Sequence, residues 1–366
     1  MGLTPIKAVS RVGGQMKVLI VHPSNGFYGG AEEVIIQLCK YLEAKNHSVR
    51  LITMHNPKEL ETWVALPKPR NWLEFRAQVQ SCLGFYDIVN VHNFPATLTT
   101  FPKKVPTVYM CNEPAELFTK LWKKPIETFN RWWVRKSGMK VVVADQVNAD
   151  RFKSIYKVEP TIIPYGIDYK FWSQGVRQSR QDNKVKILQV GTVTPYKNQL
   201  ESIRALEHLV DRGIDASLTL AGSLPDEYYY KKVLKPFIDD YGLQEYTEVL
   251  GQQTHEELRY LLYTHDVLLH PVKGQGGWLV PFEAMCTGLP VVTIPLFSAS
   301  SLIEDNNLGI VTRAIEQVIV NKGYEKLDTK KIKDWVRDNL TWEKFGESMV
   351  KVFEETGVIR SEEDLL

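Results

Sequence analysis

The chain has 366 residues, enough for two domains of ordinary size that each bury a core. Its formal net charge of +2 is too small to indicate a nucleic-acid partner, and we expect none. The four cysteines are widely spaced and form no C-x-x-C pair, which argues against a zinc site or a disulfide framework and indicates reduced thiols.

Membrane and secretion signals are weak. The longest mostly apolar run, residues 279–297, contains Glu283 and three prolines, so we do not expect it to span a membrane. Residues 1–15 have no apolar core and do not resemble a secretory signal; Met16 is an alternative start, or these residues form a flexible extension. We therefore expect a cytoplasmic protein.

In the first half, short β-branched runs alternate with amphipathic stretches, a pattern typical of βαβ units and a parallel sheet. It predicts a helix at 30–45 and strands at 18–22, 49–54, 88–92, 107–111 and 141–144. A second series begins after Asp168, with a helix at 198–212 and strands at 185–190, 217–221, 249–250, 267–270 and 291–294. The polar residues 173–184 between them predict an exposed loop.

The order of elements predicts an α/β protein with two doubly wound parallel-sheet domains in tandem. Apolar residues recur at helical spacing from Trp342 to Phe353, so 341–355 reads as an amphipathic helix despite Gly346. Such a helix needs a surface to cover.

Ligands of open parallel sheets bind beyond the carboxyl ends of the strands. After the first strand, Gly29 and Gly30 open a helix and could approach a phosphate or a sugar. The loop is not G-x-G-x-x-G, which disfavours a dinucleotide-dependent dehydrogenase. The alternative is a tight strand-to-helix turn without a ligand.

The loop after the strand that ends at Val190 runs from Gly191 to Gln199 and places Lys197 just before a helix. There its ammonium could neutralise a leaving diphosphate, although a single lysine at a helix start is commonly just solvated. Gly222 and Gly251 follow the next strands and leave room for a nucleotide.

Residues 275–290 join a glycine pair, Gly276 and Gly277, to a helix that carries Glu283. Two glycines allow a ligand to approach the backbone, the first helical turn attracts a diphosphate, and a carboxylate can accept two hydrogen bonds from a vicinal diol. These features suit a sugar nucleotide. A Gly-rich turn before a core helix is the alternative.

Together these segments resemble the retaining, nucleotide-sugar-dependent glycosyltransferases of family 4 (glycosyl transferases group 1), which have the GT-B fold. The resemblance runs from about Met16 to the final helix, and it is carried by the following segments: 29–32, 164–168, 191–197, 221–222, 255–258 and, above all, 275–290. It implies two Rossmann-like domains facing across a cleft: an acceptor domain at 16–166, a donor domain at 167–340, and a helix at 341–358 that crosses back to the first domain.

The resemblance also assigns roles. Lys197 would contact the donor diphosphate, Glu283 the ribose hydroxyls, and the main chain of 276–279 the phosphates and sugar. The full candidate donor set is Gly29, Gly30, Gly191, Thr192, Lys197, Gly222, Gly251, Gln275, Gly276, Gly277, Trp278, Leu279 and Glu283. The acceptor set is Tyr28, Glu32, His92, Asn112 and Glu113, and the catalytic candidates are Lys197, Glu283, Gln275, Glu113 and Asn112. No metal and no cofactor are implied.

Several positions depart from the family pattern. Gln275 replaces a common glutamate, Trp278 a glycine, and Thr192 an arginine that usually helps at the diphosphate. Asn112 stands where many members have a histidine, and Glu113 is the nearest ionisable substitute. His92 matches another family position, or it is a satisfied histidine at a strand end.

Residues 117–140 hold seven basic residues against one acid, Glu127, with five aromatic residues among them. This composition could seat the first domain on anionic lipid at the inner face of the membrane, which would suit a lipid-linked acceptor. The alternative is two amphipathic helical pieces, interrupted at Pro125, whose aromatic residues face the core.

The sequence thus predicts a retaining hexosyltransferase that uses a nucleoside-diphosphate sugar and a hydroxyl of a glycan or lipid-linked acceptor. Two alternatives remain: a nucleotide-sugar epimerase of related fold, and a catalytically weak paralogue that binds sugar nucleotide as a partner subunit. The substitutions at Gln275 and Asn112 keep the second alternative open.

Overall fold

The computed structural model describes residues 14–24, 29–55, 58–103, 105–112, 124–177, 183–224, 227–274 and 278–363. The chain divides into two compact units. Unit 1 comprises the chain up to Ala144, residues 148–164, and Trp342 onward, and unit 2 comprises Asp145–Val147 and Tyr165–Thr341. Unit 1 is therefore built from both ends of the sequence.

Unit 1 contains a six-stranded sheet in the order β2-β1-β3-β4-β5-β6, and every neighbouring pair is parallel. The strands are β1 Lys17–His22, β2 Ser48–Thr53, β3 Ile88–His92, β4 Thr107–Met110, β5 Lys140–Val143 and β6 Thr161–Ile162. The helices are α1 Gly30–Ala44, α2 Trp72–Cys82, α3 Lys124–Ser137, α4 Gln146–Tyr156 and α14 Trp342–Glu363. Strand β3, Ile88–His92, is buried along its whole length, as expected for a parallel strand covered on both faces, and it includes the polar residues Asn90 and His92.

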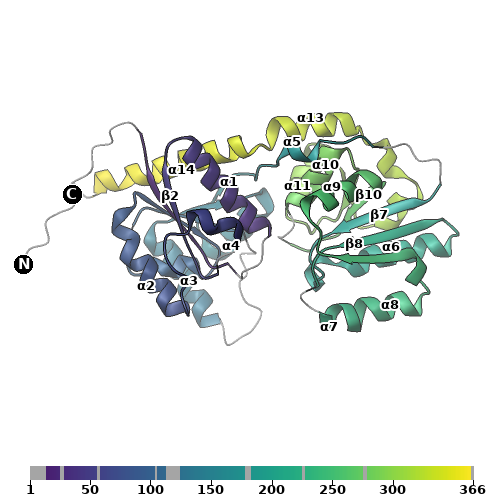
Figure 1. Ribbon diagram of the computed structural model, residues 1–366, viewed down its shortest axis with the longest axis horizontal. Coiled ribbons are helices and arrows are strands. Elements are labelled where there is room, and N and C mark those ends of the chain that lie inside the picture. The colour runs from purple at the N-terminus through teal and green to yellow at the C-terminus, as the bar shows by residue number, and fades with distance from the viewer. Residues whose placement is uncertain are drawn as a thin grey trace, which may run out of the picture. The chain divides into compact units, whose positions relative to one another are not determined.

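Alternate residues of the unit 1 strands face opposite layers. Leu19, Val21 and Val91 pack in one core with Phe75 of α2 and Trp133 of α3. Helices α1 and α14 contact each other, and Figure 1 shows the yellow α14 running beside the purple α1. The predicted amphipathic helix has its surface here, and it continues to Glu363.

Gly346 explains how α14 lies so close to α1. A Cβ atom added at Gly346 would stand 2.2 Å from the ring of Tyr41 on α1, well inside van der Waals contact. The glycine that looks unfavourable in a helix therefore permits the close crossing of two helices.

Unit 2 contains a second six-stranded parallel sheet, in the order β12-β11-β10-β7-β8-β9. Its strands are β7 Val185–Val190, β8 Ala216–Ala221, β9 Thr247–Gly251, β10 Val267–His270, β11 Val291–Thr293 and β12 Ile310–Val311. Its helices are α5 Tyr169–Trp172, α6 Gln199–Asp211, α7 Glu227–Tyr229, α8 Lys235–Asp240, α9 His255–Thr264, α10 Leu279–Thr287, α11 Ser300–Asp305, α12 Ile315–Val320 and α13 Thr329–Asn339. The expectation of doubly wound parallel sheets is confirmed.

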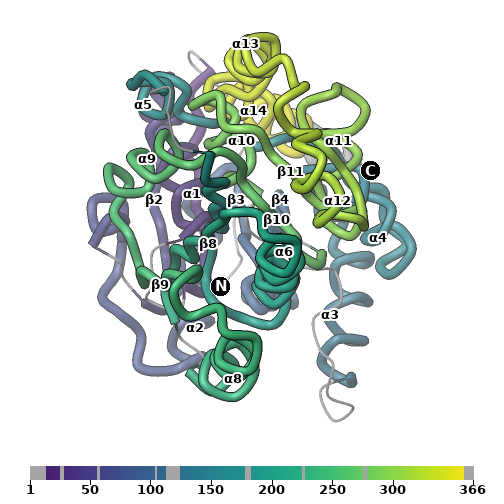
Figure 2. Tube along the Cα trace, turned by 90° about the vertical axis from the view of Figure 1, so that its right-hand side faces the viewer, coloured from purple at the N-terminus to yellow at the C-terminus, as the bar shows by residue number. Residues whose placement is uncertain are grey.

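The two faces of the second sheet are covered by different helices. Leu269 of β10 packs in a core with Ile203 and Leu206 of α6 and Ile315 of α12. Helix α10 contacts β10 from the other face, and Figure 2 shows β10 between α10 and α6. Because side chains alternate along a strand, Leu268 and His270 belong to the face that α10 covers.

Candidate functional site

Glycines end three neighbouring strands of the second sheet. Gly191, Gly222 and Gly251 follow or end β7, β8 and β9, and all three have positive φ angles of 144°, 156° and 74°. The Gly191 N–H donates to Ala221 O, and the Gly222 N–H donates to Gly251 O, both at 2.8 Å. A Cβ at Gly222 would lie 2.2 Å from Gly191 O, so only glycine allows this close approach of the strand ends.

Lys197 ends the short 3₁₀ turn Pro195–Lys197, which lies between Gly191 and α6. Asn198 follows with φ 56° and ψ 40°, and its side-chain amide donates to Pro271 O at 3.1 Å. Gln189 Nε2 donates to Lys197 O at 2.8 Å. These bonds hold the turn against the chain that leaves β10, so the backbone of Lys197 is fixed at the carboxyl edge of the sheet.

The Lys197 side chain is a buried cation. It is 5% exposed, its stem lies against Gly191, and its Nζ lies 5.3 Å from the centroid of the Tyr196 ring. Among the described residues no carboxylate forms an ion pair with it. Burial lowers the pKa of Lys197 to about 8. A buried ammonium without a carboxylate partner is costly, which makes Lys197 a candidate for binding an anionic ligand.

Other buried polar atoms near this edge lack hydrogen-bond partners within the described structure. They are both ring nitrogens of His270, Nε1 of Trp278 and Oγ of Ser298. The His270 ring packs edge to face against Phe297, with centroids 4.7 Å apart, and Ser298 is wholly buried. Sequence reasoning missed His270 and Ser298. A polar residue at the end of the strand predicted at 267–270 was the available signal for His270.

Helix α10 carries Glu283 on its first turns and ends at Gly288, whose φ is 79°. Glu283 is half-buried, and its charge, after burial, raises the pKa of Cys286 one turn further on. The Trp278 ring packs on Tyr165 and Phe282, with centroids 5.1 and 4.5 Å away. The tryptophan that replaces a glycine of the family pattern therefore anchors the start of α10 in an aromatic cluster.

At the strand ends of unit 1, His22 and Glu32 form a buried pair. His22 Nε2 lies 3.0 Å from Glu32 Oε1, and Ser24 Oγ donates to the same oxygen at 3.2 Å. Burial by itself would raise the pKa of Glu32, but the hydrogen bond and charge of His22 outweigh it and lower that pKa. Glu32 is therefore a carboxylate and an acceptor, and it fixes the proton of His22 on Nε2. His22 is a third residue that sequence reasoning missed.

His92 lies beside this pair, its ring 6.1 Å from that of His22. Asn90 Nδ2 donates to Val108 O, so Asn90 Oδ1 is an acceptor, and His92 Nε2 donates to it at 2.8 Å. Asn112 Nδ2 then donates to His92 Nδ1 at 3.1 Å. Burial and the charge of His22 lower the pKa of His92 well below its ordinary value. Both nitrogens are occupied, so the role open to His92 is to orient Asn112.

The structure thus divides the candidates between the units. Gly191, Thr192, Lys197, Gly222, Gly251, Trp278, Leu279 and Glu283 belong to unit 2, whereas Gly29, Gly30, Glu32, His92 and Asn112 belong to unit 1. Tyr28, Glu113, Gln275, Gly276 and Gly277 lie outside the described residues.

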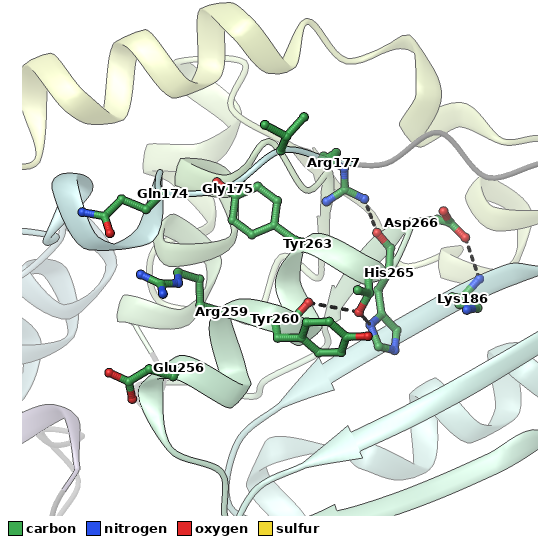
Figure 3. Close-up of a pocket in the computed structure, with 12 residues that line it drawn as sticks. Gln174, Gly175, Arg177, Lys186, Glu256, Arg259, Tyr260, Tyr263, His265 and Asp266 are labelled. Carbon is green, nitrogen blue, oxygen red and sulfur yellow. Dashed lines mark hydrogen bonds between the residues drawn. The ribbon is translucent and has the colours of Figure 1, made fainter.

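A pocket of about 570 Å³ lies elsewhere on unit 2, where Lys186 is the second residue of β7 and Asp266 precedes β10 (Figure 3). This is the amino edge of the parallel sheet. Its charged groups serve the fold: Arg177 donates to the carbonyl oxygens of Leu262 and His265, and Asp266 Oδ2 accepts from Lys186 N at 2.7 Å. Arg177 and Asp266 are thus engaged in hydrogen bonds within the unit, in contrast to the ammonium of Lys197.

The basic and aromatic segment is described from Lys124 onward, as α3. Trp133 is buried and donates its Nε1 proton to Thr97 O at 3.1 Å, as the core-helix alternative predicts. Ile126, Phe129 and Trp132 are instead 45%, 39% and 43% exposed. Helix α3 thus has a core face and an exposed apolar stripe, while residues 117–123 lie outside the description. Among the described residues, no helix is long and apolar enough to cross a membrane.

Residues 172–348 match the family "Glycosyl transferases group 1", and residues 28–171 match "Glycosyltransferase Family 4". Together the two matches cover most of both units. The chain belongs to the group 1, family 4 glycosyltransferases. A solved structure of HepE from Anabaena in complex with UDP-glucose is similar, with a TM-score of 0.75 and 19% identity over 93% of this chain and 100% of that one. The family resemblance and the GT-B fold are confirmed.

The chain also matches curated relatives, and it spans about half the length of several of them. An uncharacterized glycosyltransferase of Methanocaldococcus jannaschii is 25% identical over 56% of this chain, and the chain spans 54% of its length. The human α-1,3/1,6-mannosyltransferase ALG2 is 22% identical over 76% of this chain and 79% of its own length.

Proposed function

We propose that this protein transfers a hexose from a nucleoside-diphosphate sugar to a hydroxyl group of a glycan or a lipid-linked acceptor. The observation that carries the proposal is Lys197, a buried ammonium without a carboxylate partner in the described structure, at the glycine-lined carboxyl edge of a parallel sheet. Such an edge is where parallel sheets bind nucleotides. HepE, a similar structure, was solved with UDP-glucose, so uridine nucleotides are the first donors to test.

In the proposed reaction, the bond between the anomeric carbon and the phosphate oxygen breaks, and its electron pair leaves with the diphosphate. The ammonium of Lys197 and the N–H groups that open α6 neutralise that charge. Glu283 accepts hydrogen bonds from the ribose hydroxyls. The acceptor oxygen attacks from the face that the leaving group departs, so the anomeric configuration is retained, and its proton passes to the leaving phosphate.

No metal enters this scheme. Because Thr192 stands where the family usually has an arginine, Lys197 carries more of the neutralisation than in its relatives. In this proposal Gln275 hydrogen-bonds a sugar hydroxyl, and Asn112, oriented by His92, hydrogen-bonds the acceptor. Tyr28, Glu32 and Glu113 are the further acceptor candidates from the sequence.

The acceptor side includes a membrane surface in our proposal. The exposed stripe of Ile126, Phe129 and Trp132 lies on a helix that also carries Lys124, Arg135 and Lys136. Aromatic side chains insert at the headgroup level, and basic ones are attracted to anionic lipid. The occupant that fits this combination is an anionic leaflet, on which a lipid-linked acceptor would be presented.

A nucleotide screen tests the donor proposal. A ligand at 100 times its Kd stabilises a protein by about 2.7 kcal/mol, which a melting curve detects. We expect a uridine, guanosine, adenosine or cytidine diphosphate, or its sugar, to raise Tm, and proton NMR of the transferred product to show retention. If none of these nucleotides shifts Tm, the donor proposal fails; an inverted product would remove only the stereochemical part.

A further inference from the structure

His270 is a buried histidine that the scheme above does not use. It is 0% exposed at the carboxyl end of β10, and neither of its ring nitrogens has a partner in the described structure. Thr293 Oγ1 donates to its carbonyl oxygen at 2.7 Å, and Phe297 packs edge to face on its ring. The residue is therefore held firmly in place while its polar atoms remain unused, an arrangement that needs an explanation.

The buried ammonium of Lys197 offers an explanation for the unpartnered His270. In the sheet β10 pairs with β7, in the register Leu268↔Leu188, so the end of β10 lies beside the end of β7, from which the Lys197 turn begins. The charge of Lys197 reaches His270: after burial, it is the cause that lowers the pKa of His270 well below its ordinary value. His270 is thus a neutral imidazole, with one nitrogen that can only accept a hydrogen bond.

We propose that His270 is a positioning residue for Lys197: when the donor binds, its unprotonated ring nitrogen accepts a hydrogen bond from the ammonium and so directs the remaining N–H groups to the donor diphosphate. This inference rests on the proposed function of the site. A neutral acceptor suits this task better than a carboxylate, because it orients the ammonium without neutralising the charge that the phosphate needs. No bond forms or breaks, and no proton leaves His270.

The inference predicts a change in the melting temperature of a His270 variant. Buried polar atoms without partners destabilise a fold, so an apolar side chain of similar size should be better tolerated than histidine. His270→Leu is therefore expected to raise Tm by about 2–4 °C while it weakens UDP binding about tenfold, the effect of one lost charge-assisted hydrogen bond. His270→Gln, which supplies a neutral acceptor, should recover most of the UDP affinity.

A double-mutant cycle tests the dependence on Lys197. UDP affinity is measured by isothermal titration calorimetry for the wild type, His270→Leu, Lys197→Met and the double variant. We expect His270→Leu to weaken binding only when Lys197 is present.

Thr247→Val is the matched control. Thr247 Oγ1 is another buried atom without a partner in the described structure, but it begins β9, at the opposite edge of the same sheet. This variant should leave UDP affinity unchanged. If His270→Leu does not fold, His270→Met serves as the apolar variant, because its flexible side chain fits irregular gaps.

The outcomes separate the two proposals. If the wild type binds UDP and Lys197→Met weakens it, but His270→Leu binds UDP like the wild type, the positioning role is wrong and the donor site stands. An equal loss in both backgrounds of the cycle would also overturn it, since His270 would then act independently of Lys197. If the wild type binds no nucleotide diphosphate, both proposals fail together.

Discussion

Buried histidines stand at strand ends in both units, but their ring nitrogens differ in whether they have hydrogen-bond partners. In unit 1, His92 uses both ring nitrogens, one with Asn90 and one with Asn112. In unit 2, His270 uses neither, and the ammonium beside it has no carboxylate partner in the described structure. His22, with Nε2 bound to Glu32 and Nδ1 unpartnered, is intermediate between these two.

The difference indicates which strand ends are available to bind a ligand and which are committed to the fold. A network that satisfies itself stabilises the fold and positions a neighbour, whereas unpartnered polar groups cost stability until a ligand arrives. On this basis we expect substitutions at the ends of β7 and β10 to change ligand affinity, and substitutions at the end of β3 to change stability.

The largest effect should come from Lys197→Met. Under the proposed mechanism, removing the buried ammonium takes away the charge that neutralises the leaving diphosphate, and groups of this kind contribute about 100- to 1000-fold to the rate. Transfer or slow hydrolysis of the donor, followed by release of nucleoside diphosphate, measures it. Lys186→Met, at the amino edge of the same sheet, is the control and should keep the wild-type rate. Similar rates in both variants would contradict the assignment of Lys197.

Glu283→Ala should weaken UDP binding about 10- to 100-fold, because two hydrogen bonds from the ribose to a charged acceptor are lost. Calorimetric titration of UDP measures the loss. Titration of inorganic pyrophosphate, which has no ribose, serves as the internal control and should be unaffected. Equal losses for UDP and pyrophosphate would show that Glu283 acts on the helix and not on the ribose.

His92→Leu should lower the free energy of unfolding by about 2–4 kcal/mol, because Asn90 and Asn112 each lose a buried partner. Urea denaturation followed by circular dichroism measures this change. UDP affinity should stay at the wild-type value. A His92→Leu variant as stable as the wild type would contradict the proposed difference between the units. So would a His92→Leu variant that loses UDP affinity as His270→Leu is expected to.

UDP affinity should fall as the pH rises through about 8, by about tenfold per unit at the steepest part, because the Lys197 ammonium of the free protein loses its proton there. Folding should respond in the opposite direction. The unfolded lysine keeps its proton to about pH 10.4, so the contribution of Lys197 to the free energy of unfolding rises between pH 8 and 10.4. Titrations between pH 7 and 9 test the first part, and Lys197→Met should show a flat profile over that range.

The smallest expected effect concerns α3. Replacing Phe129 and Trp132 together by serine should reduce co-sedimentation with vesicles that contain phosphatidylglycerol by about fivefold, a loss of roughly 1 kcal/mol after partial exposure is taken into account. Phe85→Ser, at an exposed site of the same unit, is the control. Unchanged co-sedimentation of the double variant would leave α3 as a core helix with a solvated outer face.

Most strands of both sheets could be predicted, because they are short, mostly apolar runs that end at a glycine or a polar residue. Lys197 could be predicted as a candidate because it follows such a strand end. It was insufficient for His22 and His270, since a histidine at a strand end reads the same whether its nitrogens are bound or unpartnered. Only the packing of β10 against the Lys197 turn, and of β1 against α1, distinguishes these cases. The two-residue strands β6 and β12 and the extension of α14 beyond residue 358 were not predicted, because two residues, or a helix end that contains a glycine, carry too little periodicity.

Helix α14 also has a consequence for biosynthesis. It belongs to unit 1, and its face of Phe345, Met349, Val352 and Phe353 is buried there, but it is the last described helix of the chain. A ribosome therefore releases the strands of unit 1 first and their covering helix last, after all of unit 2 has been made. Until then the apolar surface beside α1 has no cover, so the unit that starts first should be the more dependent on a chaperone. The missing side chain of Gly346 lets the late helix dock onto α1 without any rearrangement of Tyr41.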